Sequence, residues 1–560
     1  MAPYLPVRRM LLCLFLGGSW LAVWSHTVLA QTSGQAFARQ DSLRGTLAPD
    51  RACYDVIYYD LNLKIHLAER RINGYNAISF RAVEDFTTIR VDLFEDFKID
   101  RIIYNNYPLG FRREGAAIVI NFKQLVPKGK LGSFKIYYHG SPRVAPDAPW
   151  DGGFSWATDA KGRPWVGVSC QHLGASAWWP NKDHLTDEPD SMRIYCEVPE
   201  PLVCVANGNL VSTMAVSGGY RGYEWKVSYP INNYNVSLNI AHYAHLQDTY
   251  VAHDGAKLAL DYYVLDYNAP KATEHFAQVK PILACFEKRF GKYPFWKDGY
   301  ALVETPYWGM EHQSAIAYGN EYKNNPFGFD YIIVHESAHE YFGNSLSIGD
   351  HAELWLHEAF ATYAEALYVE CLTGSFAKSV EYLKTQRPKI GNQDPMLGVF
   401  GVNFARWRDS DNYYKGAWML HTLRSVIQND DLWLATLAQY AQQFKLSTVG
   451  TEQAIDFFSQ KLAVNLRPFF YQYLKHAAPP RLVYQLVKQK KIFTLRYKWE
   501  TREAGFAMPV KVSFSAKDKK IPDEEITIFP TQQWQEMSRS KIKAVTFATD
   551  LYYFEPHEVK

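Results

Sequence analysis

The chain has 560 residues, of which 47% are hydrophobic, 15% aromatic and 21% charged, with a formal net charge of +2. This composition excludes an intrinsically disordered protein, because disordered chains are poor in aromatic residues and rich in net charge. The length predicts about three domains. The balanced charge offers no electrostatic basis for binding nucleic acid, so we expect no nucleic-acid partner.

The amino terminus predicts an export signal. Arg8 and Arg9 precede an apolar stretch and a cleavage site of small residues that ends at Ala30. We therefore expect residues 1–30 to be a signal peptide and the mature protein to be periplasmic or secreted. The alternative is an uncleaved membrane anchor over residues 10–30, because a bilayer span needs about 20 apolar residues.

The next part of the chain predicts strands. Apolar and polar residues alternate with a period of two, and Gly, Pro and Asn separate the alternating segments. The clearest segments are residues 59–66, 89–93, 118–122 and 134–138. We expect residues 31–50 to be a linker and residues 51–250 to form an all-β domain.

Residues 251–478 change character, with apolar residues at three- and four-residue spacing that predict amphipathic helices. Pro479 and Pro480 end the last helix. Alternating segments then return, so residues 479–560 predict a small β-sandwich. The expected fold class is multidomain α+β, with an all-β domain, a mainly helical domain and this C-terminal sandwich.

The cysteines contain no C-x-x-C unit that would indicate a metal knuckle or a redox motif. Disulfides are expected in an exported chain. Cys196 with Cys204 is the pair that we expect to form one, and buried thiols are the alternative.

An H-E-x-x-H motif lies at His335-Glu336-Ser337-Ala338-His339, in a segment without Pro or Gly. On a helix, positions i and i+4 lie on one face, so both imidazoles can reach the same metal ion. Glu336 projects beside them, where it can act on a water. The alternative is a chance match in an ordinary amphipathic helix.

Catalytic zinc takes three protein ligands and keeps one position open, so a third donor is needed. Glu358 follows His339 after 18 intervening residues, in a second helical segment. Gly343 and Gly349 supply turns between the two segments, so we expect antiparallel helices that present two histidines and a glutamate to one point. His357 is the alternative third donor.

These residues resemble the zinc aminopeptidases typified by aminopeptidase N and the leukotriene hydrolase, within the gluzincin metallopeptidases. Family members carry H-E-x-x-H, then 18 residues, then the glutamate of a W-L-N-E-G-F-like helix. This chain has W-L-H-E-A-F at that place, with His357 and Ala359 as the substitutions. The resemblance implies a thermolysin-like catalytic domain and one zinc ion held by His335, His339 and Glu358.

A second family motif, G-x-M-E-N, is present as W-G-M-E-H. The resemblance implies that Glu311 holds the free α-amino group of a substrate, with Gly309 and Met310 beside it. An anion at a set distance from the metal selects peptides by their amino terminus. Trp308 and His312 depart from the family pattern.

A third family motif, Y-x-K-G, begins at Tyr413. The resemblance implies that the Tyr413 hydroxyl stabilises the oxyanion of the tetrahedral intermediate, and Tyr414 is the alternative. Gln171 resembles the residue that family members extend towards the substrate amine, as a helper of Glu311. Thr362 lies one helical turn after the third ligand, where support for a ligating histidine would be useful.

Together these motifs predict a zinc-dependent aminopeptidase that acts on peptides with a free amino terminus, with Glu336 as general base and Tyr413 as oxyanion stabiliser. A zinc endopeptidase or an epoxide hydrolase on the same scaffold are the alternatives among enzymes. A non-catalytic peptide-binding protein is the alternative of another class. We expect membrane association only if residues 10–30 remain as an anchor.

Overall fold

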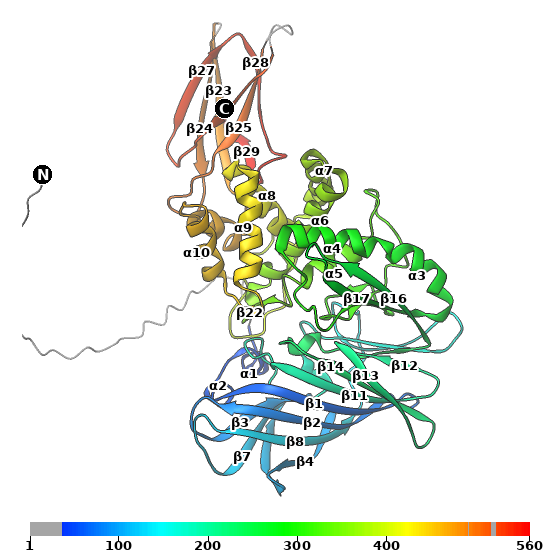
Figure 1. The fold of residues 1–560 in the computed structure, drawn as a ribbon. Helices are drawn as coiled ribbons and strands as arrows, with labels where there is room; N and C mark the ends of the chain where they lie inside the picture. Colours follow the sequence, from blue (N-terminus) through cyan, green and yellow to red (C-terminus); the bar gives the residue numbers. More distant parts are fainter. Residues whose placement is uncertain (1–35, 491, 517–521) are drawn as a thin grey trace, which may run out of the picture.

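The computed structural model describes residues 36–490, 492–516 and 522–560, so the predicted signal peptide lies outside the described residues. In Figure 1 an N-terminal β-domain, a mainly helical domain and a C-terminal β-domain follow one another from bottom to top. This arrangement confirms the expected fold class. Among the described helices, none combines the length and the apolar character that crossing a bilayer requires.

The N-terminal domain is built on a sheet with the strand order β13-β14-β11-β1-β2-β8-β4-β5. These strands are β1 (Tyr54–His66), β2 (Arg71–Ala82), β4 (Phe97–Tyr104), β5 (Tyr107–Pro108), β8 (Leu131–Gly140), β11 (Ser191–Pro199), β13 (Asn209–Val216) and β14 (Tyr220–Val227). β1 is antiparallel to β2 and parallel to β11. Along β1 the buried residues alternate, as at Leu61, Leu63 and Ile65, which gives the sheet one apolar face.

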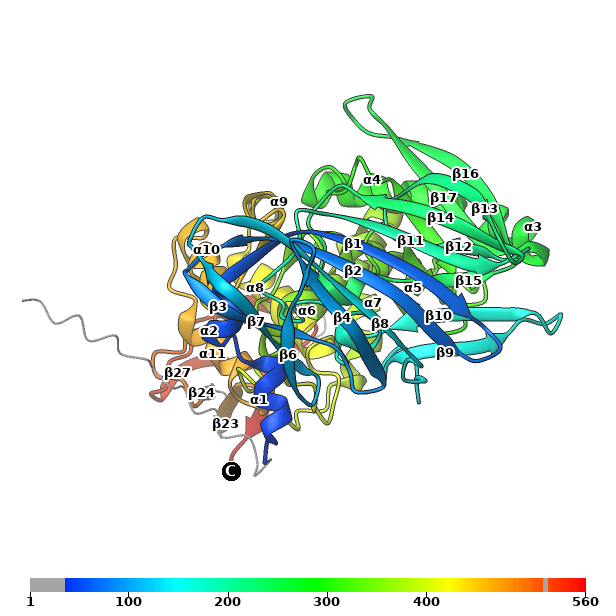
Figure 2. The ribbon, with the colours of Figure 1, turned by 90° about the horizontal axis from the view of Figure 1, so that it is seen from below.

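Smaller sheets complete this domain, with the strand orders β3-β7-β6 and β12-β15-β10-β9. Their strands are β3 (Phe86–Asp92), β6 (Gly110–Glu114), β7 (Ala117–Val126), β9 (Gly153–Thr158), β10 (Pro164–Ser169), β12 (Val203–Val205) and β15 (Asn239–Ala241). The view from below in Figure 2 shows β1, β2 and β8 lying across the catalytic domain.

The described part of the expected linker is helical. Residues 39–52 form α1 (Arg39–Gly45) and α2 (Pro49–Ala52). The guanidinium of Arg51 is fully buried and pairs with the carboxylate of Asp92 on β3. A buried charge has to be paired, so this ion pair ties the segment to the β-domain.

The boundary between the first two domains lies near residue 242 and not at residue 250. β16 (Tyr243–Val251) pairs with β17 (Lys257–Leu265), and the sheet continues in the order β16-β17-β18-β20-β19. The other strands are β18 (Tyr300–Glu304), β19 (Gly309–Met310) and β20 (Ile316–Tyr318). Alternation alone could not assign β16 to this sheet, because strand pairing is a tertiary contact.

The helices of the catalytic domain are α3 (Ala269–His275), α4 (Val279–Phe290), α5 (Tyr331–His339), α6 (Trp355–Thr373), α7 (Phe376–Gln386), α8 (Tyr414–Ile427), α9 (Asp430–Gln443), α10 (Thr451–Lys461) and α11 (Arg467–Leu474). The short strands β21 (Leu346–Ser347) and β22 (Ser447–Thr448) pair beside them. α5 and α6 pack against each other.

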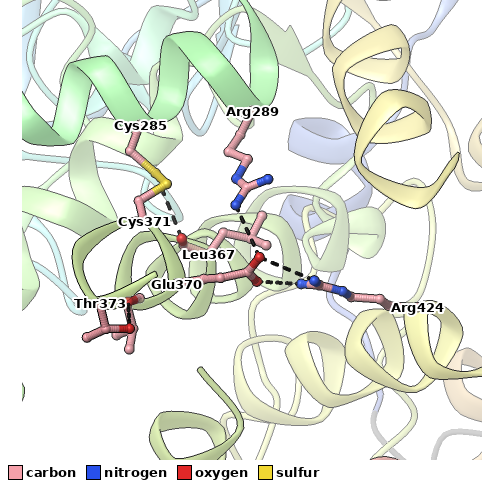
Figure 3. Close-up of a disulfide and its surroundings, with 8 residues drawn as sticks. Cys285, Arg289, Leu367, Glu370, Cys371, Thr373 and Arg424 are labelled. Carbon is pink, nitrogen blue, oxygen red and sulfur yellow. Dashed lines mark hydrogen bonds and ion pairs between the residues drawn. A yellow bond between two sulfur atoms is a disulfide. The ribbon is translucent and has the colours of Figure 1, made fainter. Parts of the chain in front are cut away.

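A disulfide between Cys285 on α4 and Cys371 on α6 ties these helices together (Figure 3). Next to it, Glu370 pairs with Arg289 and Arg424, so α4, α6 and α8 are linked at one point. The expected pairing of Cys196 with Cys204 is wrong. Both of these residues carry buried free thiols in the described part of the chain.

The C-terminal domain consists of facing sheets with the orders β27-β24-β23-β29 and β26-β25-β28. Their strands are β23 (Arg481–Gln489), β24 (Ile492–Glu500), β25 (Val510–Ala516), β26 (Glu524–Ile528), β27 (Gln535–Ser540), β28 (Ile542–Phe547) and β29 (Glu555–Glu558). The buried Lys415 on α8 donates to the carbonyl oxygens of His476 (3.0 Å) and Ala477 (2.6 Å), at the junction with this domain.

Candidate metal centre and active site

The structure brings His335, His339 and Glu358 together, as expected from the motif spacing. α5 begins with Asp330 as its N-cap, which accepts from the Ile332 amide at 2.9 Å and sets the start of the helix that carries both histidines. Glu358 lies in the first turn of α6. All three side chains are buried.

The donor atoms of this triad are spaced for a tetrahedral metal ion. The Nε2 atoms of the two histidines are 3.1 Å apart, and Glu358 Oε2 lies 3.5 Å from His335 Nε2 and 3.3 Å from His339 Nε2. Ligands at zinc distances on a tetrahedron are about 3.3 Å apart. Glu358 Oε2 is buried without a hydrogen-bond partner among the described residues, so this oxygen can act as a metal ligand.

The other nitrogen of each histidine is already engaged. His335 Nδ1 bonds to Glu365 Oε1 at 2.8 Å, and His339 Nδ1 bonds to the carbonyl oxygen of Phe342 at 2.9 Å. These acceptors require a proton on Nδ1 and leave Nε2 free to bind a metal. Glu365, and not Thr362, therefore supports the ligating histidine. Glu365 lies two helical turns after Glu358 on the same face of α6, and this spacing could have identified it from the sequence.

The ionised carboxylate of Glu358 also favours the binding of a cation at the triad. Burial would raise the pKa of Glu358, but the imidazoles of His339 and His335 outweigh it and lower that pKa well below its usual range. His357, the alternative third donor, lies outside this group of donor atoms. Burial lowers the pKa of His357 to about 3, so this imidazole is neutral.

Glu336 lies beside the metal triad, as expected for a group that acts on a water. Burial raises its pKa to about 7, and the carboxylates of Glu311 and Glu358 act in the same direction. A Cβ atom on Gly309 would lie 2.9 Å from Glu336 Oε1. A glycine at this position therefore lets β19 approach the carboxylate closely.

Glu311 lies within reach of the same centre. Its carboxylate, that of Glu336 and the imidazole of His339 have donor atoms within 4.8 Å of one another. Glu311 Oε1 accepts a bond from Gln171 Nε2 at 2.5 Å and from the Tyr234 hydroxyl at 3.1 Å. The structure thus joins Gln171 to Glu311, as expected. Tyr234 was missed, because it belongs to the β-domain and no local pattern distinguishes it.

Tyr413, and not Tyr414, faces the metal centre. Its ring stacks on that of His335, with centroids 6.0 Å apart and an interplanar angle of 16°. Burial, together with Glu358 and Glu311, raises the pKa of Tyr413 well above its usual value, so the hydroxyl keeps its proton and can donate. The Tyr414 hydroxyl lies 3.4 Å from Lys389 Nζ, on the outside of the site.

All these groups line one cavity between the N-terminal and catalytic domains. Gly309 and Met310 lie in its wall, as the second motif implied, and Met310 also belongs to the apolar core of the β-domain. The lining residues that sequence reasoning did not assign to the site are Pro149, Trp150, His172, Trp308, Tyr331 and Ile332. Residues of both domains therefore line the cavity.

Residues 278–473, which carry both helices of the triad, match the model of the Peptidase family M1 domain. This part of the chain is therefore similar to the peptidase family M1 domain. The resemblance noted from the motifs is thereby confirmed, and zinc is the metal that this family implies for the triad.

The chain is similar to aminopeptidase B of Mus musculus, with 22% identity over 364 residues that cover 62% of this chain and 53% of that protein. It is also similar to aminopeptidase N of Caulobacter vibrioides, with 21% identity over 319 residues that cover 53% of this chain and 37% of that protein. The chain thus spans about half or less of the length of these relatives.

Among solved structures, the M1 zinc metallopeptidase from Deinococcus radiodurans has a TM-score of 0.63 and 19% sequence identity, and the match covers 75% of this chain and 93% of that one. This similarity shows that the fold is shared. A mutant of that protein has been solved bound to a Tyr-Ser-Ala substrate.

The chain departs from the family motif at His312, which follows Glu311. The side chain is buried, and neither ring nitrogen has a hydrogen-bond partner within the described ranges. Burial lowers its pKa to about 3, so the imidazole is neutral there. His312 therefore adds no positive charge beside Glu311.

Proposed function

We propose that this protein is a zinc-dependent aminopeptidase, which hydrolyses the first peptide bond of peptides with a free amino terminus. The observation that carries the proposal is the position of the buried Glu311 carboxylate beside the metal triad, in one cavity. A carboxylate there can pair with an ammonium group and so sets the distance from the amino terminus to the metal.

The ammonium group of the substrate would be held by Glu311 and Gln171. The Tyr234 hydroxyl and the Gln171 amide both donate to Glu311 Oε1, which orients the carboxylate before the substrate arrives. Gln171 would accept from the ammonium through its own oxygen. A blocked amine would lose the ion pair and leave a buried carboxylate without its partner.

One zinc ion, bound to the triad, would supply a Lewis acid that polarises the first carbonyl group and lowers the pKa of water. Glu336 would accept the proton of the attacking water and return it to the leaving nitrogen as the C–N bond breaks. The hydroxyl of Tyr413 would donate to the oxygen that gains negative charge. Glu365 would keep the His335 ring in its ligating orientation.

We also propose that the protein is exported. The Cys285–Cys371 disulfide supports this, because disulfides persist in oxidising compartments. The signal peptide predicted over residues 1–30 gives the route. The alternative is a protein that keeps residues 10–30 as a membrane anchor, and determining the amino-terminal residue of the exported protein distinguishes the two.

The first test compares Glu336→Gln with the unchanged protein. We expect the variant to keep its zinc and to lose hydrolysis of aminoacyl amides by a factor of roughly 10³ or more, because the proton acceptor is gone. Metal analysis and initial rates, with and without a chelator, measure both effects. Glu381→Gln, which changes an exposed acid on α7, is the matched control. Near-normal turnover by Glu336→Gln would refute the assigned role.

A pair of peptides separates the aminopeptidase from the endopeptidase. We expect the free peptide to be cleaved at its first bond and its N-acetylated form to resist cleavage. Equal cleavage of both peptides would favour an endopeptidase. Hydrolysis of epoxides without hydrolysis of peptides would favour the epoxide hydrolase.

A further inference from the structure

Two tryptophans lie exposed at the cavity that holds the metal triad. Trp150 is 57% exposed and Trp308 is 43% exposed, and their ring centroids are 6.1 Å apart. Trp150 comes from the β8–β9 loop of the N-terminal domain, whereas Trp308 directly precedes β19 of the catalytic domain. Exposed aromatic side chains gathered at a cavity are typical of a binding surface.

The aromatic side chains continue from this pair down to the metal centre. The ring centroids of Trp308 and Tyr331 are 5.6 Å apart, and those of Tyr331 and His335 are 5.4 Å apart. The lining near the tryptophans also includes Pro149 and Ile332. Among the described lining residues, the charged groups belong to the metal triad, Glu336 and Glu311. The part of the lining around the two tryptophans is therefore apolar.

Trp308 is held in place before any ligand binds. Its indole Nε1 donates to Asn320 Oδ1 at 3.1 Å, and its carbonyl oxygen accepts from the Gly319 amide at 2.7 Å. Asn320 in turn donates to Asp330 Oδ1 at 2.8 Å, and Asp330 caps α5. This chain of bonds fixes the ring relative to the helix that carries both metal-binding histidines.

The strand β19 determines where each residue of a bound peptide would lie along the cavity. Trp308 and Gly319 form a hydrogen-bonded pair, and Gly309 and Tyr318 are the next pair in the antiparallel register. Such pairs alternate, so the peptide groups of Gly309 face away from β20. β19 is the outer strand of this sheet among the described strands, so these groups face the cavity that Gly309 lines.

The substrate amine would lie next to Glu311. The bond to be cut would lie next to Gly309, because Gly309 is beside Glu336. Extended chains rise about 3.3 Å per residue, both in the strand and in a bound peptide. The residue that follows the cut bond therefore lies at the level of Trp308.

We propose that Trp150 and Trp308 clamp the side chain of the second substrate residue, and that the enzyme prefers an aromatic or large apolar residue there. This inference rests on the proposed aminopeptidase function. Apolar faces from two domains would pack on that side chain and remove its surface from water, and aromatic rings add a favourable contact beyond the buried area. A charged second residue would lose its water without gaining a partner.

The test measures kcat/KM for Ala-Phe-Ala, Ala-Gly-Ala and alanine amide, which lacks a second residue. For Trp150→Ala and Trp308→Ala we expect a loss of about fivefold to tenfold with Ala-Phe-Ala. We expect less than a twofold change with Ala-Gly-Ala and alanine amide. Trp308→Phe should restore most of the loss. Trp534→Ala, which removes an exposed tryptophan of the C-terminal domain, is the matched control.

Equal losses with all three substrates would overturn the proposal, because a structural role would give that result. A loss of kcat/KM in the tryptophan variants with Phe-Gly-Ala would overturn it as well, because the loss would then depend on the first residue of the substrate. If the unchanged protein hydrolyses none of these substrates, the aminopeptidase proposal fails instead. The clamp is then tested by titration calorimetry of Ala-Phe-Ala and Ala-Gly-Ala with the Glu336→Gln variant. The clamp predicts that Ala-Phe-Ala binds more tightly than Ala-Gly-Ala, and that this difference disappears when Trp308→Ala is added. Equal binding of the two peptides would refute the clamp.

Discussion

The carboxylate of Glu365 accepts hydrogen bonds from three side chains at once. Besides the bond from His335, Oε2 accepts from the Tyr382 hydroxyl at 2.5 Å and from Gln386 Nε2 at 2.7 Å. These donors satisfy the buried carboxylate and hold it in one orientation against the imidazole. It thereby fixes the tautomer of His335 and increases its basicity towards a metal.

We therefore expect Glu365→Gln to weaken zinc binding by about 10- to 100-fold, because the His335 ring loses the carboxylate that orients it. Competition with a chromogenic chelator measures the affinity. Tyr382→Phe removes one of the donors and keeps the carboxylate, so it should have a smaller effect. Unchanged zinc affinity in Glu365→Gln would show that His335 is oriented by its packing alone.

At the scale of elements, α1 holds the loop that carries Gln171. The half-buried guanidinium of Arg44 donates to the carbonyl oxygens of Leu173 and, at 3.4 Å, His172. The other side of this loop is bound from the catalytic domain, where Asn403 Nδ2 donates to the same His172 oxygen at 3.1 Å. A segment that precedes the β-domain therefore positions part of the proposed amine site.

We expect Arg44→Ala to raise KM for substrates with a free amine by about fivefold to tenfold and to change kcat less. A hydrogen bond from a charged group contributes about 1.5–3 kcal/mol, and only part of this free energy affects the position of Gln171. Steady-state rates with aminoacyl amides measure this split. Arg39→Ala, on the same helix but exposed and paired with Glu114, is the control. A fall in kcat with constant KM would contradict a positioning role.

At the scale of the whole molecule, neutral buried histidines make the folded state sensitive to acid. His421 on α8 is fully buried and donates from Nε2 to the carbonyl oxygen of Asp550 at 3.0 Å, so it joins the catalytic and C-terminal domains. Burial, with Arg424 acting in the same direction, lowers its pKa to about 4. An unfolded chain restores the usual value of about 6.5.

Below pH 6.5 the unfolded chain therefore binds a proton at His421 that the folded chain does not bind until about pH 4. Stability is lost as the pH falls through this window. Between pH 7 and pH 5 the contribution of this residue to the free energy of unfolding should fall by about 2 kcal/mol. Denaturant unfolding of the unchanged protein and of His421→Gln, at both values, measures the difference. A difference independent of pH would contradict the neutral state of this imidazole.

Local patterns were sufficient for part of the site. The two histidines of the triad lie four residues apart on one helix, and Glu336 lies between them, so their grouping follows from the geometry of α5. Glu358, Glu311 and Tyr413 required family motifs, because the segments that carry them meet only in the folded chain. The alternation along β1 and the helical spacing of α6 likewise predicted these elements.

Other features depended on contacts between distant segments. Tyr234 bonds to Glu311 across 77 positions of sequence, and the disulfide joins cysteines 86 positions apart. The pairing of Trp150 with Trp308 brings together two domains. β16 has the alternation of the β-domain but pairs with β17 of the catalytic domain.

The sequence by itself therefore determined the class of fold and the grouping of His335, His339 and Glu336, because these follow from helix periodicity, strand alternation and motif spacing. Only the tertiary structure decided what surrounds them: the hydrogen-bond partners of Glu311 and His335, the pairing of the cysteines, and the aromatic walls of the cavity. Such contacts arise when separate elements pack to bury their apolar faces. No local pattern records which residues will meet.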